Sequence, residues 1–292
     1  MKKILTLLGI SLFLIVSFTN CSKDEEAGSP TMTFKNETGY ITQNTTASYG
    51  DTLLFGINAN SNGEDNLVKF TVSVNNQLLL DSTINSQTFA FDFYTIKSAA
   101  DVEAWTMTIT DVAGHTASLS ATITGEFGEI DSYTTILMGA QDNVDVESFL
   151  SLADNHATTY MQAAAFEYQD KIDMFCYYEN TPEHQNMMTL GSPGSNITGI
   201  FSGATSPENY TTKNLTYFVK TTLSASNFDA VQNDAWVLAS FDPENQFKKA
   251  KVLTAGDVYA FKLQSGKYGL LKVIEVTGTE TGTLEIGIKV QK

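Results

Sequence analysis

The sequence predicts a mainly β protein: a β-sandwich, then a β-rich α+β domain with one short helix and a C-terminal antiparallel meander. Apolar and polar residues alternate with a period of two through residues 53–124, as in strands with one buried face. Three similar segments, separated by glycine-bearing turns, close the chain at residues 257–290. Residues 224–231 combine helical spacing with a serine at the start, which predicts the helix.

Length and charge limit the possible functions. The chain has 292 residues, and 42% of them are hydrophobic. This length exceeds what a single hydrophobic core usually supports, so two domains are predicted. Its formal net charge of −16 excludes a nucleic-acid partner, because a polyphosphate would be repelled. All 17 basic residues are lysines, so no bidentate arginine contact to a carboxylate or phosphate is available. We therefore expect a ligand to meet aromatic faces, amides and hydroxyls.

Residues 1–20 are predicted to be an export signal. Lys2 and Lys3 make a short basic start, and the apolar run of residues 4–18 would give only about 22 Å of helix, too short to span a bilayer. Cys21 follows, and the arrangement resembles a bacterial lipoprotein signal, cut before a cysteine that carries lipid. The resemblance implies lipidation of Cys21, although Asn20 replaces the usual Gly or Ala. The alternative is an ordinary cysteine within a secretory signal.

An acidic tether of residues 21–29 is expected after the signal. Its residues Lys23, Asp24, Glu25 and Glu26 resemble the surface-export signal of Bacteroidetes lipoproteins. The resemblance implies an outer-membrane lipoprotein that faces outward; a simple solvated tether is the alternative. Because the surface is acidic, attachment to the membrane is expected to come from lipid chains rather than charge.

Residues 30–125 are predicted to form an Ig-like β-sandwich. About seven strands in ~95 residues is the size of that fold. The apolar residues at alternating positions are Leu53, Phe55, Ile57, Phe70, Val72, Val74, Phe89, Phe91, Phe93, Trp105, Met107, Ile109, Leu119, Ala121 and Ile123. The closing hairpin, residues 105–124, resembles the end of bacterial Ig-like or PKD-like surface domains, which implies a spacer or adhesive module. Its alternation places Trp105 in the core.

Residues 130–292 are predicted to form the second, β-rich domain after a glycine-bearing break at 125–129. Strands are expected at 133–138, 172–178, 257–263, 268–276 and 283–290, and surface loops at 180–214. Phe228 and Val231 should face inward from the predicted helix. Periodicity does not decide whether residues 236–239 are a strand or a helix.

The last strands also carry a resemblance. Residues 256–261 and 266–273 look like a carboxy-terminal domain common in uncharacterised Bacteroidetes lipoproteins. That resemblance implies a location and an architecture but no reaction.

Motifs for catalysis or for a metal are absent from the sequence. There is no Gly-x-Ser-x-Gly elbow, Walker loop or dinucleotide fingerprint, and the three histidines are scattered. Asp142, Asp145 and Glu147 could offer oxygens to calcium, but they lack the EF-hand spacing, so a solvated turn is the favoured interpretation. We expect no cofactor, no metal and no catalytic residue, and a buried, inert Cys176. A hydrolase that uses two of the 33 acidic residues stays an alternative.

Aromatic residues in the second domain are the candidate ligand-binding residues. Sugar binding uses aromatic faces together with amide and carboxylate side chains. The candidates are Tyr160, Tyr177, Tyr178, Tyr210, Tyr217 and Trp236. The competing interpretation is that the tyrosines fill a β-rich core.

The function predicted from the sequence is therefore binding or adhesion. We expect a lipid-anchored protein of the cell surface whose partner, besides the outer membrane, is a glycan or another surface protein. The alternatives are a carbohydrate-binding accessory of a polysaccharide-uptake system and the carboxylate-based hydrolase.

Overall fold

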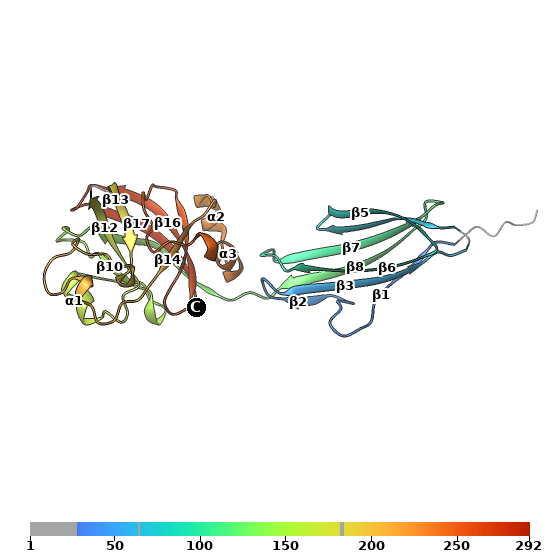
Figure 1. Cartoon of the computed structure of the whole chain (residues 1–292), viewed down its shortest axis with the longest axis horizontal. Helices are drawn as coiled ribbons and strands as arrows, with labels where there is room; N and C mark the ends of the chain where they lie inside the picture. The colour runs from blue at the N-terminus through green and yellow to red at the C-terminus, as the bar shows by residue number, and fades with distance from the viewer. Residues whose placement is uncertain (1–27, 64, 182–183) are drawn as a thin grey trace, which may run out of the picture.

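A computed structural model describes residues 28–63, 65–181 and 184–292. These residues are mainly β, with four sheets and few short helices among them, and the fold-class prediction is confirmed. Strands up to Gly125 form two of the sheets, and strands from Ile130 onward form the other two. Figure 1 shows these N-terminal and C-terminal halves joined by a short extended stretch. Among the described residues, no helix is long and apolar enough to cross a membrane.

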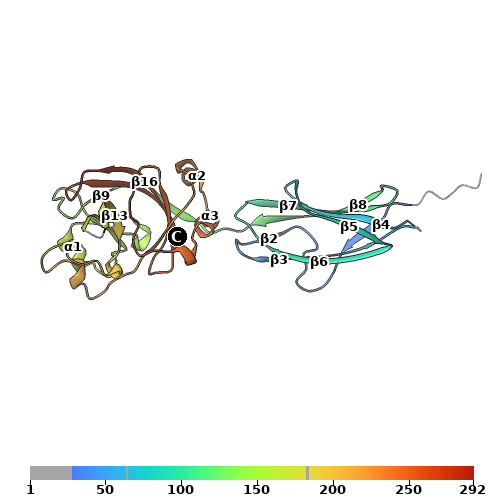
Figure 2. The same cartoon turned by 45° about the horizontal axis from the view of Figure 1, so that its top comes forward.

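The N-terminal half is a sandwich of a three-stranded and a five-stranded sheet. The first sheet has the order β1-β3-β6, and the second has the order β2-β8-β7-β4-β5. Figure 2 shows β3 and β6 lying opposite β7 and β8. The strands are β1 (Thr31–Phe34), β2 (Thr45–Ala47), β3 (Thr52–Asn60), β4 (Leu67–Val74), β5 (Gln77–Ser86), β6 (Thr88–Ile96), β7 (Val102–Asp111) and β8 (Thr116–Gly125).

The period-two pattern correctly identifies the inward faces of this sandwich. Phe55, Phe70 and Met107 are fully buried in one core that both sheets share. Trp105 is buried as expected, and its ring lies 5.2 Å from that of Phe55. Phe93 stacks on Phe55 at 5.1 Å, so aromatic rings from β3, β6 and β7 hold the two sheets together.

The C-terminal half also packs two sheets face to face. One has the order β14-β15-β16-β17-β9 and the other β11-β10-β12-β13. Between them lies a core that includes Met174, Cys176, Phe218 and Phe261. The strands are β9 (Ile130–Gly139), β10 (Phe149–Ser151), β11 (Thr158–Tyr160), β12 (Met174–Thr181), β13 (His184–Gly191), β14 (Tyr217–Lys220), β15 (Val258–Lys262), β16 (Tyr268–Thr277) and β17 (Thr283–Gln291).

Short helices and loops cover the outer faces of these two sheets. Helices α2 (Ala225–Ala230) and α3 (Asp234–Ala239) pack on the larger sheet, and α1 (Gln162–Glu167) packs on the smaller one. The predicted helix is confirmed: the Ser224 side chain accepts the Asn227 N–H, and Phe228 and Val231 are buried. The undecided residues 236–239 belong to α3. Single 3₁₀ turns occur at Ala153–Asn155, Pro193–Ser195, Pro207–Asn209 and Pro243–Asn245.

The prediction of surface loops at 180–214 is wrong in two respects. Residues 184–191 form β13, which pairs antiparallel with β12. The following loop covers the smaller sheet, and its Phe201 and Tyr210 are buried there. Polar residues dominate this stretch, and such a composition is typical of surface loops. A few apolar residues nevertheless hold it in place, because they are buried; Met188 and Leu190 are among them. The predicted meander is confirmed, because β15, β16 and β17 pair in sequence.

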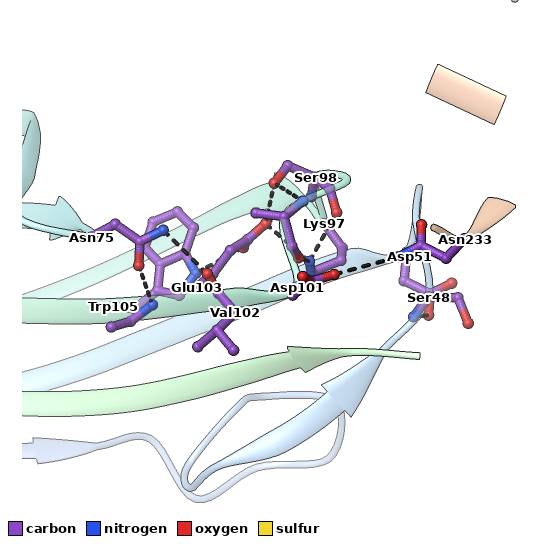
Figure 3. Close-up of polar contacts among 12 residues, drawn as sticks. Ser48, Asp51, Asn75, Lys97, Ser98, Asp101, Val102, Glu103, Trp105 and Asn233 are labelled. Carbon is purple, nitrogen blue, oxygen red and sulfur yellow. Dashed lines mark hydrogen bonds and ion pairs between the residues drawn. The ribbon is translucent and has the colours of Figure 1, made fainter. Parts of the chain in front are cut away.

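A buried lysine closes the end of the sandwich that faces the C-terminal half (Figure 3). Lys97 is fully buried, and its Nζ donates to the carbonyl oxygens of Ser98 and Ala100 at 2.8 and 2.5 Å. Its ion pair with Glu103 measures 3.4 Å. Trp105 also donates its indole N–H to Glu103, at 3.1 Å. Burial alone would raise the pKa of Glu103, but hydrogen bonds from the Ser98 hydroxyl and N–H and from Trp105, together with the Lys97 charge, hold it below its ordinary value.

Residues 126–129, between the two halves, are held by contacts on both sides. The Phe127 ring lies 5.2 Å from Lys97 Nζ. Gly128 donates its N–H to Asp234 Oδ1 at 2.7 Å, and Glu129 pairs with Lys292 at 2.7 Å. The linker therefore rests on the sandwich at one end and on the C-terminal half at the other.

The predicted lipid attachment site and export signal lie outside the described residues. This concerns Cys21, Lys23, Asp24, Glu25 and Glu26, all within residues 1–27. Their roles stay predictions.

Candidate functional site

The candidate site is a hollow of about 550 Å³ on the C-terminal half, which we call the lysine hollow. It lies where the edge strand β14 meets the strand β15 and the segment 247–251. Its lining residues are Ser195, Phe218, Lys220, Phe247, Lys248, Lys249, Lys251 and Tyr259. Four of the chain's 17 lysines therefore surround one concave surface.

Backbone pairing explains why these lysines gather. Phe247 exchanges hydrogen bonds with Phe218 of β14, at 2.7 and 2.8 Å. Three residues later, Ala250 exchanges two hydrogen bonds of 2.9 Å with Leu190 of β13. Segment 247–251 therefore bridges the edge strands of the two sheets and closes the sandwich on this side. The buried Ala250 fixes the segment, and the lysines around it project toward the hollow.

A buried carboxylate positions two of the lysines. Glu179 is buried, and its oxygens lie 3.1 Å from Lys249 Nζ and 3.2 Å from Lys251 Nζ. Burial alone would raise the pKa of Glu179, but the bonds and charges of both lysines hold it below its ordinary value. Glu179 is therefore ionised at neutral pH and keeps the two ammonium groups at the hollow's edge.

The third lysine is fixed from the opposite side. Lys220 pairs with Asp257 at 2.9 Å and lies 5.8 Å from the centre of the Tyr259 ring. The Tyr259 hydroxyl donates to the carbonyl oxygen of Lys251 at 3.0 Å. Burial raises the pKa of Tyr259 to about 12, so its hydroxyl stays neutral. With Lys248, the hollow has four ammonium groups against two carboxylates, a local excess of two positive charges.

Two unusual residues belong to the segment that borders the hollow or directly follow it. Phe247 is 67% exposed, although its backbone N–H and carbonyl both bond to Phe218, so most of its side chain is open to solvent. Val252 follows the last lysine with a φ of 55°, a left-handed conformation that β-branched residues rarely adopt. Such backbone strain often accompanies functional sites. The lysine hollow therefore combines positive charge, a fixed backbone and an exposed aromatic ring.

The predicted aromatic residues do not form one surface. Tyr177 and Tyr210 are buried beneath the loop that covers the smaller sheet, and half-buried Tyr160 packs against Tyr168 at 5.3 Å. Tyr178 packs against the central core, and Tyr217 begins β14; both are half-buried.

Trp236 is the most exposed of the candidates. It lies on α3 with 46% of its surface exposed, beside a small hollow of about 130 Å³. None of the six candidates lines the lysine hollow, although the Tyr177 ring centre lies 5.9 Å from Nζ of the lining residue Lys249. The sequence interpretation missed Phe247 and the lysines, although residues 248–251 are the densest basic run after the export signal.

The other residues considered for chemistry lie in ordinary surroundings. Asn143 holds the acidic turn, because its Oδ1 accepts the N–H groups of Asp145 and Val146. Glu147 accepts a bond from Thr159. Within the part of the chain that the structure describes, no group of three His, Cys, Asp or Glu side chains could hold a metal ion. Cys176 is buried as predicted, and burial raises the pKa of its thiol.

A second hollow, of about 400 Å³, surrounds Asp173 at the seam of the two C-terminal sheets. Asp173 is buried, and its Oδ2 accepts the Leu152 N–H at 2.7 Å. Asp154, Asp170 and Lys267 also line this hollow. Burial raises the pKa of Asp173 to about 6 from its ordinary 3.8, against the opposing effects of the Leu152 bond and the Lys267 charge.

This shift predicts a stability that depends on pH. The folded chain holds the Asp173 proton more tightly than the unfolded chain, so the contribution is complete below about pH 4 and is lost as pH rises through about 6. The change is on the order of 3 kcal/mol. Asp173→Asn should remove it, which urea unfolding of both proteins from pH 4 to 7 would measure. If the free energy of unfolding changed with pH by the same amount in both proteins, the assignment of this pH dependence to Asp173 would be contradicted.

Comparison with known proteins gives only distant structural likenesses. No family model matches the chain, and no curated protein matches it. A DUF4466 family protein from Parabacteroides merdae is 14% identical, with a TM-score of 0.42 over 90% of this chain and 98% of the other.

Two further solved structures are even less similar. Fibronectin(III)-like modules of Clostridium thermocellum CbhA are 11% identical, with a TM-score of 0.25 over 34% of this chain and 47% of theirs. A structure described as carbohydrate-binding modules of the β-sandwich superfamily is 10% identical, with a TM-score of 0.21 over 91% and 93%.

Proposed function

We propose that this chain is a binding protein of the cell surface, anchored by lipid at Cys21, that holds a saccharide in the lysine hollow. One observation carries the proposal: a hollow of about 550 Å³ has an exposed aromatic ring, Phe247, on a segment that hydrogen bonds fix at both ends. Ligand sites have this size, and saccharides stack on aromatic faces of this kind. The sandwich of the N-terminal half would act as a spacer between the anchor and the binding half.

The test is a saccharide-binding measurement with the full chain and a Phe247→Ala variant. We expect binding to an array of polysaccharide fragments and a loss of about tenfold in affinity when the stacking ring is removed. Tyr94→Ala is the matched control, because Tyr94 is 74% exposed on β6 of the other half. Equal binding by the wild-type protein and the Phe247 variant would contradict this site.

The alternative of a carboxylate-based hydrolase is supported by the Asp173 hollow. It combines a buried carboxyl of raised pKa with two further acids, Asp154 and Asp170. Release of reducing ends from a polysaccharide by the wild-type protein, abolished in Asp173→Asn, would favour the hydrolase. Binding without release by either protein would favour the binding role.

A further inference from the structure

The lysine hollow has a local positive charge, although the chain as a whole is negatively charged. The chain has 33 acidic and 17 basic residues, yet four lysines and only two carboxylates meet here. The two carboxylates do not cancel the positive charge. Glu179 is buried below Lys249 and Lys251, whose side chains remain 24% and 30% exposed, and Asp257 forms an ion pair with Lys220, which is 57% exposed.

The lysines are positioned before any ligand arrives. Glu179 holds Lys249 and Lys251, and Asp257 holds Lys220, so these three ammonium groups have limited freedom to lose on binding. Lys248 is exposed, and its own carbonyl oxygen accepts a bond of 2.7 Å from the Ser195 hydroxyl, which fixes its backbone. Positioned cations around a concave surface favour an anionic group inside it.

The negative charge of the whole chain disfavours a broad anionic surface and permits a narrow anionic polymer as the partner. A flat anionic bilayer would face much of the acidic surface and would be repelled. A narrow polymer can enter the hollow and contact mainly its local positive charge. The exposed ring of Phe247 offers a stacking face for a pyranose, and Phe218 and Tyr259 supply a buried aromatic floor.

We propose that the ligand of the lysine hollow is an acidic polysaccharide, whose carboxylate or sulfate groups pair with Lys220 and Lys248 while a sugar ring stacks on Phe247. The inference rests on the proposed function, because it adds a charge requirement to a saccharide site. Lysine suits this task without arginine, since it acts as a point charge and requires no bidentate geometry.

The experiment is calorimetry of the full chain with tetragalacturonate, a sulfated oligosaccharide and the methyl ester of tetragalacturonate, which keeps the sugar skeleton and loses the charge. We expect at least one of the two acidic probes to bind, the uncharged methyl ester to bind about tenfold more weakly than that probe or not at all, and the affinity of the acidic probe to fall between 50 and 200 mM salt. The double variant Lys220→Gln/Lys248→Gln should weaken acidic binding about tenfold.

A matched double variant controls for net charge. Lys69 and Lys292 lie in exposed ion pairs with Asp81 and Glu129, so Lys69→Gln/Lys292→Gln removes the same charge elsewhere. It should leave affinity unchanged, and urea unfolding should show that both double variants remain folded, since all four side chains are exposed.

The outcomes separate this inference from the proposed function. If tetragalacturonate and its methyl ester bound equally well and Phe247→Ala abolished both, the ligand would not need to be acidic. That result would overturn this inference and keep the saccharide site. Binding of no saccharide would overturn both. If the protein bound vesicles of anionic lipid and no acidic saccharide, the ligand of the hollow would be a membrane surface and not a polysaccharide. That result would also overturn the inference.

Discussion

Replacing Lys97 by methionine is expected to lower the free energy of unfolding by about 3–5 kcal/mol. The ammonium group is fully buried and is the counter-charge of Glu103, which is also buried. Methionine fills much of the same space, but it removes the counter-charge of that buried carboxylate and the donor to the carbonyl oxygens of Ser98 and Ala100. The loss should therefore exceed that of an ordinary surface substitution several-fold.

Equilibrium unfolding in urea, followed by tryptophan fluorescence, measures this effect because Trp105 donates a hydrogen bond to the same carboxylate. The control is Lys69→Met, which removes an exposed ion pair with Asp81 and should change stability by no more than about 1 kcal/mol. The double variant Lys97→Met/Glu103→Gln should recover part of the loss. A Lys97 variant as stable as the control would show that the buried pair contributes little.

Replacing Cys21 by alanine is expected to release the protein from the membrane completely. Lipid chains are the predicted attachment, and each buried methylene of an acyl chain contributes about 0.8 kcal/mol to membrane binding. A protein of net charge −16 has no electrostatic attraction to an anionic bilayer that could replace them. Fractionation of cells that express the variant, followed by detection of the protein in the membrane and soluble fractions, makes the measurement.

The chain provides its own control for this change. Cys176→Ala alters the second of the two cysteines, which is buried between the C-terminal sheets. That variant should lose some stability and keep its membrane association. If Cys21→Ala remained in the membrane fraction, the lipid anchor would be disproved, and the spacer role of the sandwich would lose its basis.

The parts of the fold that the sequence predicts depend on local pattern. Alternation around Phe55 and Trp105 identifies the core of the sandwich, because each strand has one buried and one wet face. Serine and asparagine at the start of α2 form a capping box. Glycines with positive φ, Gly266 and Gly278, mark the turns of the meander.

The candidate site could not be predicted in the same way, because pairing distant in sequence creates it. Lys220 and Lys249 meet only because segment 247–251 joins the edge strands β14 and β13. Nothing local indicates that pairing. Burial of Tyr177 and Tyr210 likewise depends on a loop, distant in sequence from Tyr177, that packs on the smaller sheet.

A crystal structure of the protein with a bound acidic oligosaccharide would test the lysine hollow directly as the ligand site. We expect electron density for the sugar in the lysine hollow, with one ring against Phe247 and an anionic group within about 3 Å of the Lys220 or Lys248 ammonium. Density for the oligosaccharide in the Asp173 hollow or beside Trp236, with the lysine hollow empty, would contradict this prediction.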